Sequence, residues 1–233
     1  MKRINLNCDV GEGQNNETQL LPYIDACNIA CGGHFGNYAS MNDVVNIAIQ
    51  NNVKIGAHPS YPDPVNFGRK TLKISESDLI NSIQEQIDDL LIVLNEHGAI
   101  LNHIKPHGAL YNDIAKDKNL ALTFLKAIDK YENVKLFVPY NSEIEKEAVK
   151  NEKLIIYEAF ADRNYHSDLT LVSRIEKNAV LTNVKSIKRH IKSMLLKNEV
   201  ITITKEKVFI KADTFCVHSD TENAIDIVKN LQN

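Results

Sequence analysis

Residues 103–112 (HIKPHGALYN) place two histidines and a lysine within five positions. The proline that follows Lys105 disfavours a helical conformation at that lysine, so the two histidines are not expected on one helix face. We predict a short strand that ends near Lys105, then a tight turn, then a helix that begins around Tyr111. Titratable groups at a strand end, beside a glycine that lets a ligand approach, are typical of an active or binding site. The alternative is a surface turn with two solvated histidines, and we favour the site.

Six further strands are predicted along the chain, and helices separate most of them. Short apolar runs that end in polar loops predict strands at residues 4–8, 27–30, 53–57, 135–138, 154–158 and 214–217. Helices are expected at residues 40–51, 75–97, 111–131, 143–150, 184–196 and 222–231, and the longer ones show apolar residues at spacings of three and four. A small hairpin is expected at residues 200–204 and 208–211. The alternation of strands and helices predicts a parallel sheet.

Polar side chains gather directly after the predicted strands. They are Asp9, Glu12, His34, His58, Lys105, His107, Glu158, Asp162, Arg163, His218 and Asp220. In a closed barrel the carboxyl ends of all strands form one face, where active sites gather. An open sheet would bring together only the groups near its switch point. We therefore predict an α/β fold, a seven-stranded β/α barrel that forms a single domain over residues 1–233.

The composition excludes several classes of function. The net charge of −3 gives no electrostatic reason to bind nucleic acid or an anionic membrane. The first residues turn polar too soon for a signal peptide, and no apolar run approaches the roughly 20 residues of a membrane helix. The four cysteines are spread out and form no CxxC pair. We expect free thiols in a reducing cytoplasm.

Six motifs in chain order resemble those of the LamB/YcsF family. They are LNCDVGEG at residues 6–13, NIACG at 28–32 with His34, GAHPSYPD at 56–63, KPHGALYN at 105–112, EAFADR at 158–163 and CVHSDT at 216–221. The sequence departs from the family pattern around His34. The family usually has an aromatic residue at the position of Gly33, alanine at Phe35 and aspartate at Asn37.

This resemblance covers almost the whole chain and implies both a fold and an activity. The implied fold is a seven-stranded β/α barrel similar to the glycoside hydrolase/deacetylase barrels. The implied activity is the opening of 5-oxoproline to glutamate, coupled to ATP hydrolysis, as the A subunit of an enzyme with separate B and C subunits.

The candidate residues suit this reaction. A lactam is an amide with a poorly electrophilic carbonyl, and phosphorylation of its oxygen explains why ATP would be needed. Lys105 and Arg163 could neutralise the substrate carboxylate or a transferring phosphate. His58 or His107 could be the general base, because histidine titrates near neutral pH.

Two carboxylates complete the expected site. Asp9 and Glu12 could orient a histidine or hold Mg²⁺ with the phosphates of ATP. The sequence has no GxxxxGK[ST] phosphate loop, so ATP must contact another loop or a partner subunit. We expect a catalytic set of Asp9, Glu12, His58, Lys105 and His107, and a substrate-binding set of His34, Arg69, Tyr111, Glu158, Asp162, Arg163 and His218.

Two other functions stay open at this point. One is a metal-dependent hydrolase like the deacetylases, with Asp9, His34, His58 and His107 as candidate ligands. The other is a binding subunit without catalysis. Outside these sets, His97 and His190 are interpreted as surface residues, and the cysteines at strand ends as small core residues.

Overall fold

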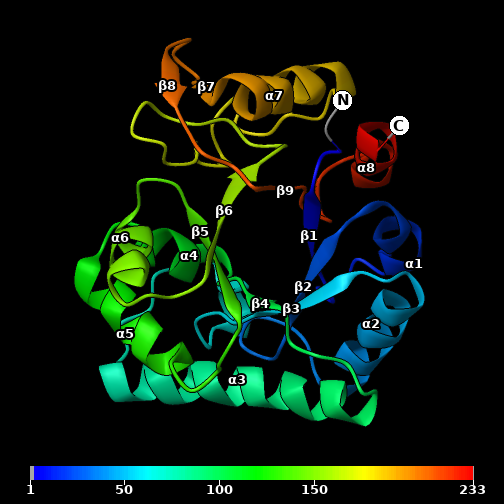
Figure 1. Cartoon of the computed structure of the whole chain (residues 1–233), viewed down its shortest axis with the longest axis vertical. Helices are drawn as coiled ribbons and strands as arrows, with labels where there is room; N and C mark the ends of the chain where they lie inside the picture. The colour runs from blue at the N-terminus through cyan, green and yellow to red at the C-terminus, as the bar shows by residue number, and fades with distance from the viewer. Residues whose placement is uncertain (1–2, 233) are drawn as a thin grey trace.

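Seven parallel strands close into a barrel within residues 3–232, the part of the chain that this computed structural model describes. The strands surround a central axis, and helices cover the outside (Figure 1). In the order of pairing they are β1 (Leu6–Val10), β2 (Ala26–Ala30), β3 (Lys54–His58), β4 (His103–Ile104), β5 (Lys135–Pro139), β6 (Ile155–Phe160) and β9 (Thr214–Cys216). The prediction of a seven-stranded β/α barrel is confirmed.

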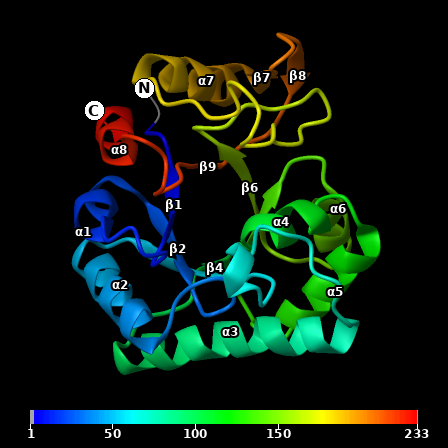
Figure 2. The ribbon, with the colours of Figure 1, turned by 180° about the vertical axis from the view of Figure 1, so that it is seen from behind.

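The helices alternate with these strands along the chain. They are α1 (Glu17–Leu20), α2 (Tyr38–Gln50), α3 (Glu76–Glu96), α4 (Gly108–Ile114), α5 (Lys118–Ile128), α6 (Glu143–Lys150), α7 (Val184–Lys197) and α8 (Ala224–Gln232), with 3-10 turns η1 (Leu21–Tyr23) and η2 (Pro64–Asn66). The predicted hairpin is present as β7 (Glu199–Ile201) paired antiparallel with β8 (Lys207–Phe209). It lies beside α7, on the opposite side of the molecule from α3 (Figures 1 and 2).

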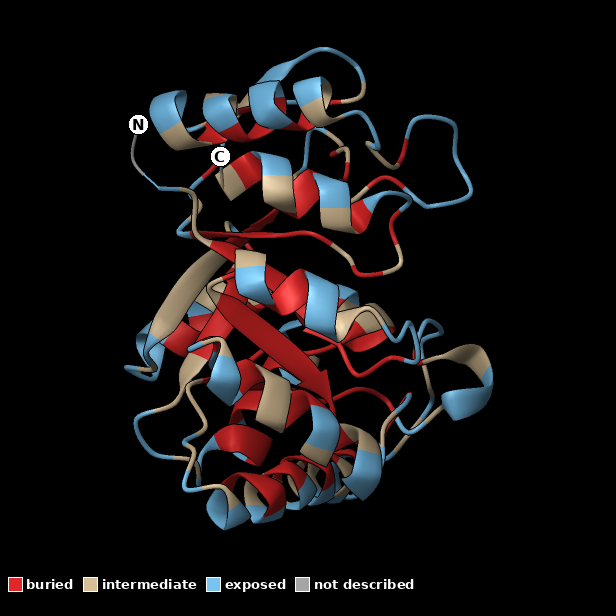
Figure 3. Ribbon diagram, turned by 90° about the vertical axis from the view of Figure 1, so that its right-hand side faces the viewer, coloured by how far each residue is buried: buried red, intermediate tan, exposed pale blue. Residues whose placement is uncertain are grey.

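Local sequence explains where the long helices begin and which face they bury. The side chain of Ser75 accepts a hydrogen bond from the backbone N–H of Asp78 and caps α3. The apolar residues of α3 at spacings of three and four are buried, and its other face is exposed. Figure 3 shows the same division on other helices, with buried inner faces and exposed outer faces. In the described part of the chain no helix is long and apolar enough to cross a bilayer.

Several boundaries differ from the predicted ones in ways that matter for the site. The first and sixth strands each end two residues later than predicted, so Asp9 lies inside a strand rather than after it, and Glu158 lies within a strand rather than at its last residue. The helix after the central motif begins at Gly108 rather than near Tyr111. It also ends early, because the side chain of Asp117 caps a separate helix, α5.

The barrel interior contains a polar network in addition to its apolar core. The Asn7 side chain donates to Thr214 Oγ1 at 3.0 Å and accepts from Asn28 Nδ2 at 2.9 Å. His103 Nε2 donates to Asn28 Oδ1 at 2.7 Å. Asn28 and His103 belong to β2 and β4, which are not neighbours in the barrel, so this bond crosses the interior. The network lies beneath the carboxyl ends of the strands and supports the groups described next.

His190 was expected at the surface, and this expectation is wrong. The residue lies on the inner face of α7, is buried, and stacks on the Tyr165 ring at 6.0 Å between centroids. All four cysteines are buried and free, as expected.

Candidate active site

Lys105 lies at the centre of a buried cluster of charges. Its Nζ is 2.8 Å from Asp9 Oδ1, 3.0 Å from Glu158 Oε1 and 3.1 Å from Cys216 Sγ. Only 2% of the residue is exposed, and it lines the cavity described below. Burial opposes the charge of Lys105, but its anionic neighbours, Asp9 foremost, hold its pKa well above the ordinary value. The lysine therefore stays a cation between carboxylates.

Two backbone carbonyls fix the orientation of the paired histidines. His58 Nδ1 lies 2.7 Å from the carbonyl oxygen of Lys105, and His107 Nε2 lies 3.0 Å from that of Phe67. A carbonyl can only accept, so each of these ring nitrogens carries a proton and donates it. The remaining nitrogens, His58 Nε2 and His107 Nδ1, face each other at 3.0 Å. In the neutral imidazoles both present lone pairs to the same point.

Glu12 and His34 complete this cluster. Glu12 Oε1 lies 2.8 Å from His34 Nε2, 3.2 Å from His107 Nδ1 and 3.8 Å from His58 Nε2. The rings of His34 and His107 are stacked, with centroids 3.6 Å apart. Burial would raise the pKa of Glu12, but the close contacts with His107 and His34 hold this pKa well below its ordinary value. Glu12 is therefore a carboxylate.

The pKa values of the three histidines are shifted in different directions. Burial lowers the pKa of His34 to about 4 and also lowers that of His107. For His58 burial acts in the same direction, but the Asp9 carboxylate outweighs it and raises the pKa. Asp9 Oδ2 lies 3.4 Å from His58 Nε2, so it links this cluster to Lys105.

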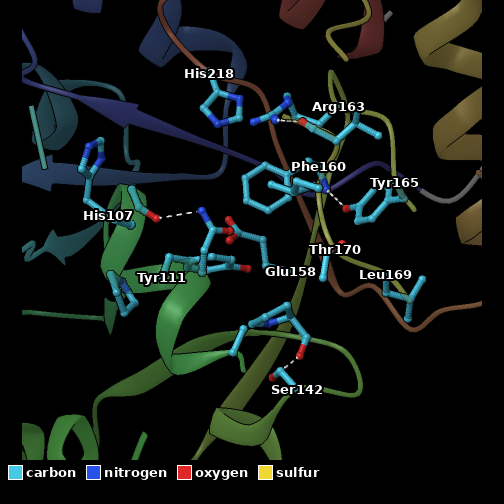
Figure 4. A pocket seen from close by; sticks show the side chains of 18 of the residues that line it. His107, Tyr111, Ser142, Glu158, Phe160, Arg163, Tyr165, Leu169, Thr170 and His218 are labelled. Atoms are coloured by element: carbon cyan, nitrogen blue, oxygen red, sulfur yellow. Dashed lines mark hydrogen bonds between the residues drawn. The ribbon is translucent and has the colours of Figure 1, made fainter. Parts of the chain in front are cut away.

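A cavity of about 570 Å³ opens onto these groups at the carboxyl ends of the strands. Its size is within the usual range for small-molecule sites. Tyr111 of α4, Glu158 and Phe160 of β6, Arg163 just after β6, and His218 lie around it (Figure 4). Among the described residues, the Tyr111 hydroxyl, Glu158 Oε2 and Arg163 Nε are buried without a hydrogen-bond partner, whereas Glu158 Oε1 has Lys105 Nζ at 3.0 Å. Such groups are rare in folded proteins, and they favour a polar ligand here.

Arg69 and Asp162 have different positions from the other predicted binding residues. Arg69 lies at the cavity rim, where its Nη2 is 2.8 Å from Asp220 Oδ2 and its side chain is 45% exposed. Asp162 is buried and does not line the cavity; it accepts hydrogen bonds from the backbone and Nδ1 of His218 and from Thr221. Asp162 thus positions His218. His34 likewise lies behind His107 and outside the cavity lining.

The structure also adds residues that the sequence reasoning missed. Asn28 Nδ2 donates to Asp9 Oδ1 at 2.8 Å and fixes that carboxylate beside Lys105. The Phe160 ring lies 5.3 Å from Lys105 Nζ, a cation–π distance. Cys216, interpreted as a core residue, accepts from the same Nζ. A polar Asn28 inside an otherwise apolar strand was the one available signal.

Together these features define a β/α-barrel protein with a charged, ligand-accessible site at the carboxyl ends of its strands. The model of the LamB/YcsF family matches residues 4–233, and the chain belongs to this family.

Relatives and a solved structure align over nearly the full length. The chain is 37% identical over 238 residues to the A subunit of 5-oxoprolinase from Bacillus cereus (strain B4264), covering 99% of this chain and 94% of the relative. It is 36% identical over 232 residues to a protein of the same name from Haemophilus influenzae (strain PittEE), covering 99% and 95%. The crystal structure of a lactam utilization protein from Thermus thermophilus aligns with a TM-score of 0.90 at 29% identity, covering 99% and 94%.

Proposed function

We propose that this protein is the A subunit of an ATP-dependent 5-oxoprolinase. The reaction would open 5-oxo-L-proline to L-glutamate, coupled to hydrolysis of ATP to ADP and phosphate. The observation that carries this proposal is the buried Lys105 between Asp9 and Glu158, beside the His58–His107 pair on a cavity of about 570 Å³. Near-full-length identity of 37% to proteins named as the A subunit of 5-oxoprolinase supports it.

The charges in the cavity suit a small carboxylate that also carries an amide. Arg163 is buried at the cavity wall with a free Nε, and Arg69 lies at the rim, so either could bind the carboxylate of the substrate. The Tyr111 hydroxyl is free to donate to a carbonyl or phosphate oxygen. Lys105 would stabilise negative charge that develops on the lactam oxygen.

A base is needed to activate the attacking water. His107 and His58 are the candidates, because their facing nitrogens lie beside Glu12 and Asp9 on the cavity. Glu12 would orient His107, and Asp9 would stabilise His58 in its protonated form. In many enzymes a carboxylate orients an imidazole in the same way, and the imidazole accepts and donates the proton.

The proposal also includes ATP and the B and C subunits. Phosphorylation of the lactam oxygen by ATP, with Mg²⁺ on the phosphates, would make the carbonyl carbon of the ring susceptible to attack by water. The sequence offers no phosphate loop, so we infer that ATP is bound with help from the B and C subunits. We place this reaction in the cytoplasm, where ATP is available.

A second candidate function is an amide hydrolase that uses a metal and needs no ATP. The convergence of Glu12, His34, His58 and His107 is the observation that favours it. The two functions differ in whether ATP and partner subunits are required, because such a hydrolase would act as the isolated chain. A binding subunit without catalysis is the third possibility, and a loss of activity on mutating the cavity would argue against it.

Reconstitution tests the proposal. The chain, with and without B and C subunits from a bacterial 5-oxoprolinase, is assayed for glutamate and phosphate. We expect both products only when the chain, both partners, 5-oxoproline and ATP are all present. Glutamate formation by B and C at the same rate without this chain would contradict the proposal. Hydrolysis by the chain alone without ATP would support the second candidate.

A further inference from the structure

Four side-chain atoms converge on one point beside the cavity. They are Glu12 Oε1, His34 Nε2, His58 Nε2 and His107 Nδ1. All ligand atoms of these four residues lie within 4.8 Å of one another, close enough to bind one metal ion. We propose that these four residues form a binding site for one divalent transition metal ion, with Zn²⁺ as the best match. This inference concerns metal binding by the chain itself, and a bound ion would occupy the ring nitrogens that the proposed function considers for the general base.

The hydrogen bonds of the two central histidines are the first argument. Because His58 Nδ1 donates to the Lys105 carbonyl and His107 Nε2 donates to the Phe67 carbonyl, their other nitrogens are free to act as ligands. Histidines that bind metals commonly donate their second N–H to a carbonyl in this way, which fixes the ring. Two ring nitrogens held 3.0 Å apart beside a carboxylate are placed to bind one cation together.

The spacing of the four atoms is the second argument. A tetrahedral Zn²⁺ with bonds of about 2.0–2.1 Å places its ligand atoms roughly 3.3–3.4 Å from one another. Four of the six distances here are 2.8 Å for Glu12–His34, 3.0 Å for His58–His107, 3.2 Å for Glu12–His107 and 3.8 Å for Glu12–His58, and all six are within 4.8 Å. They scatter around the tetrahedral value, so small side-chain movements would complete the coordination.

The donor set selects the kind of metal. Three imidazoles and one carboxylate suit Zn²⁺ and neighbouring transition metals, whereas Mg²⁺ prefers an all-oxygen set. His34 is the weakest of the four, because its Nδ1 is buried and has no partner among the described residues to fix the ring.

The position of the site connects it to the cavity. Glu12, His58 and His107 line the cavity, and Asp9 lies next to them with its Oδ2 3.4 Å from His58 Nε2. A metal here would lie beside a ligand in the cavity. It would also replace the positive charge that a protonated His58 otherwise supplies to Asp9 and Glu12.

Metal analysis of the protein purified without a polyhistidine tag tests this inference. The chain is stripped with a chelator and titrated with Zn²⁺ by calorimetry, and with Co²⁺ by visible spectroscopy. We expect about one ion per chain and the intense visible bands of four-coordinate Co²⁺. His58→Ala and His107→Ala should each weaken Zn²⁺ binding roughly 100-fold or more, and His34→Ala should weaken it less. Glu12→Gln, which keeps the shape of the side chain, should also weaken it.

A control variant separates this site from adventitious binding. His97→Gln removes a histidine at the end of α3, which bonds to Asn42 and lies outside the cluster. It should bind Zn²⁺ as the wild type does. Absence of a stoichiometric Zn²⁺ signal together with no visible Co²⁺ bands in the folded wild type would overturn the inference. Equal weakening in His97→Gln and His107→Ala would also overturn it. Neither result depends on 5-oxoproline, ATP or the partner subunits, so failure here leaves the proposed function standing.

Discussion

At the scale of single residues, Lys105 balances two buried carboxylates, and its removal should be costly for folding. Replacing it with methionine would leave Asp9 and Glu158 buried without their cation. Breaking a buried ion pair in this way typically costs about 3–5 kcal/mol. We expect Lys105→Met to lower the free energy of unfolding in urea by that order.

The control for this prediction is Lys126→Met. Lys126 forms an exposed ion pair with Glu76 at 3.1 Å, and such surface pairs contribute roughly 0–1 kcal/mol. A loss in Lys105→Met no larger than that in Lys126→Met would mean that the buried carboxylates are not charged in the folded protein.

The identities of the site residues could be predicted from the sequence, but their contacts could not. Asp9, His58, Lys105 and His107 were all expected in one cleft, because each lies near a strand end. Their burial was not foreseen, since a turn residue in sequence can still point into a barrel. The role of Asn28 depends on the register between β1 and β2, which pairs it with Asp9, and sequence alone does not give that register.

At the scale of elements, strands β3 and β4 fit together only because Gly56 has no side chain. A Cβ at this position would lie 2.2 Å from His103 Nε2. The His103 ring cannot easily move, because it stacks on Phe137 at 4.2 Å and bonds to Asn28. We expect Gly56→Ala to destabilise the protein by about 1–3 kcal/mol, the usual cost of overpacking.

A double-mutant cycle isolates this contact. In a His103→Ala background the space beside residue 56 is empty, so adding Gly56→Ala should cost much less than it does in the wild type. Urea unfolding of the four proteins gives the coupling energy. The same cost in both backgrounds would show that the destabilisation comes from the backbone and not from the clash.

Helix α7 should make stability depend on pH through His190. Burial lowers the pKa of His190 to about 4 in the folded protein, from about 6.5 when unfolded. Between these values the unfolded chain binds a proton that the folded chain does not, so stability falls as the pH drops below about 6.5. At about pH 5 this one residue should cost roughly 2 kcal/mol relative to neutral pH.

The variant His190→Phe tests this prediction, because phenylalanine keeps a ring beside Tyr165 without a titrating group. Between neutral pH and about pH 5, the wild type should lose roughly 2 kcal/mol more unfolding free energy than the variant. Other buried histidines, such as His103 with a pKa of about 3, lower stability in the same direction in both proteins. Equal losses in the two proteins would contradict the prediction.

The elements themselves were largely predictable, and their ends were less so. Apolar residues at spacings of three and four identified α3, because this pattern is local in sequence. The division between α4 and α5 was missed, because the Asp117 cap interrupts a run that reads as one helix. The later end of β1 was missed because Asp9 is charged and was interpreted as loop, and β6 was ended at the charged Glu158 although it continues to Phe160. Charged residues inside a strand are stable here only because the barrel brings them to Lys105.

At the scale of the whole molecule, barrel closure explains how distant motifs form one site. β1 pairs with β2 on one side and with β9 on the other, so residues near both ends of the chain meet at the same axis. Asp9, Lys105 and Cys216 are therefore neighbours despite their separation in sequence. The number of predicted strands and their polar ends indicated a closed barrel, whereas the cavity wall formed by residues 168–175 gave no periodic signal.

The Lys105–His107 motif is proposed to perform the chemistry of a 5-oxoprolinase complex. The most direct test is the rate of glutamate formation by the chain assembled with B and C subunits, measured for the wild type, His107→Ala and His97→Gln. Assembly of each variant is first verified by size-exclusion chromatography. Removal of a general base typically lowers the rate by about 100-fold or more. We expect such a loss of 5-oxoproline- and ATP-dependent glutamate formation for His107→Ala, and a wild-type rate for His97→Gln. A wild-type rate in the assembled His107→Ala complex would contradict the proposed role of the motif.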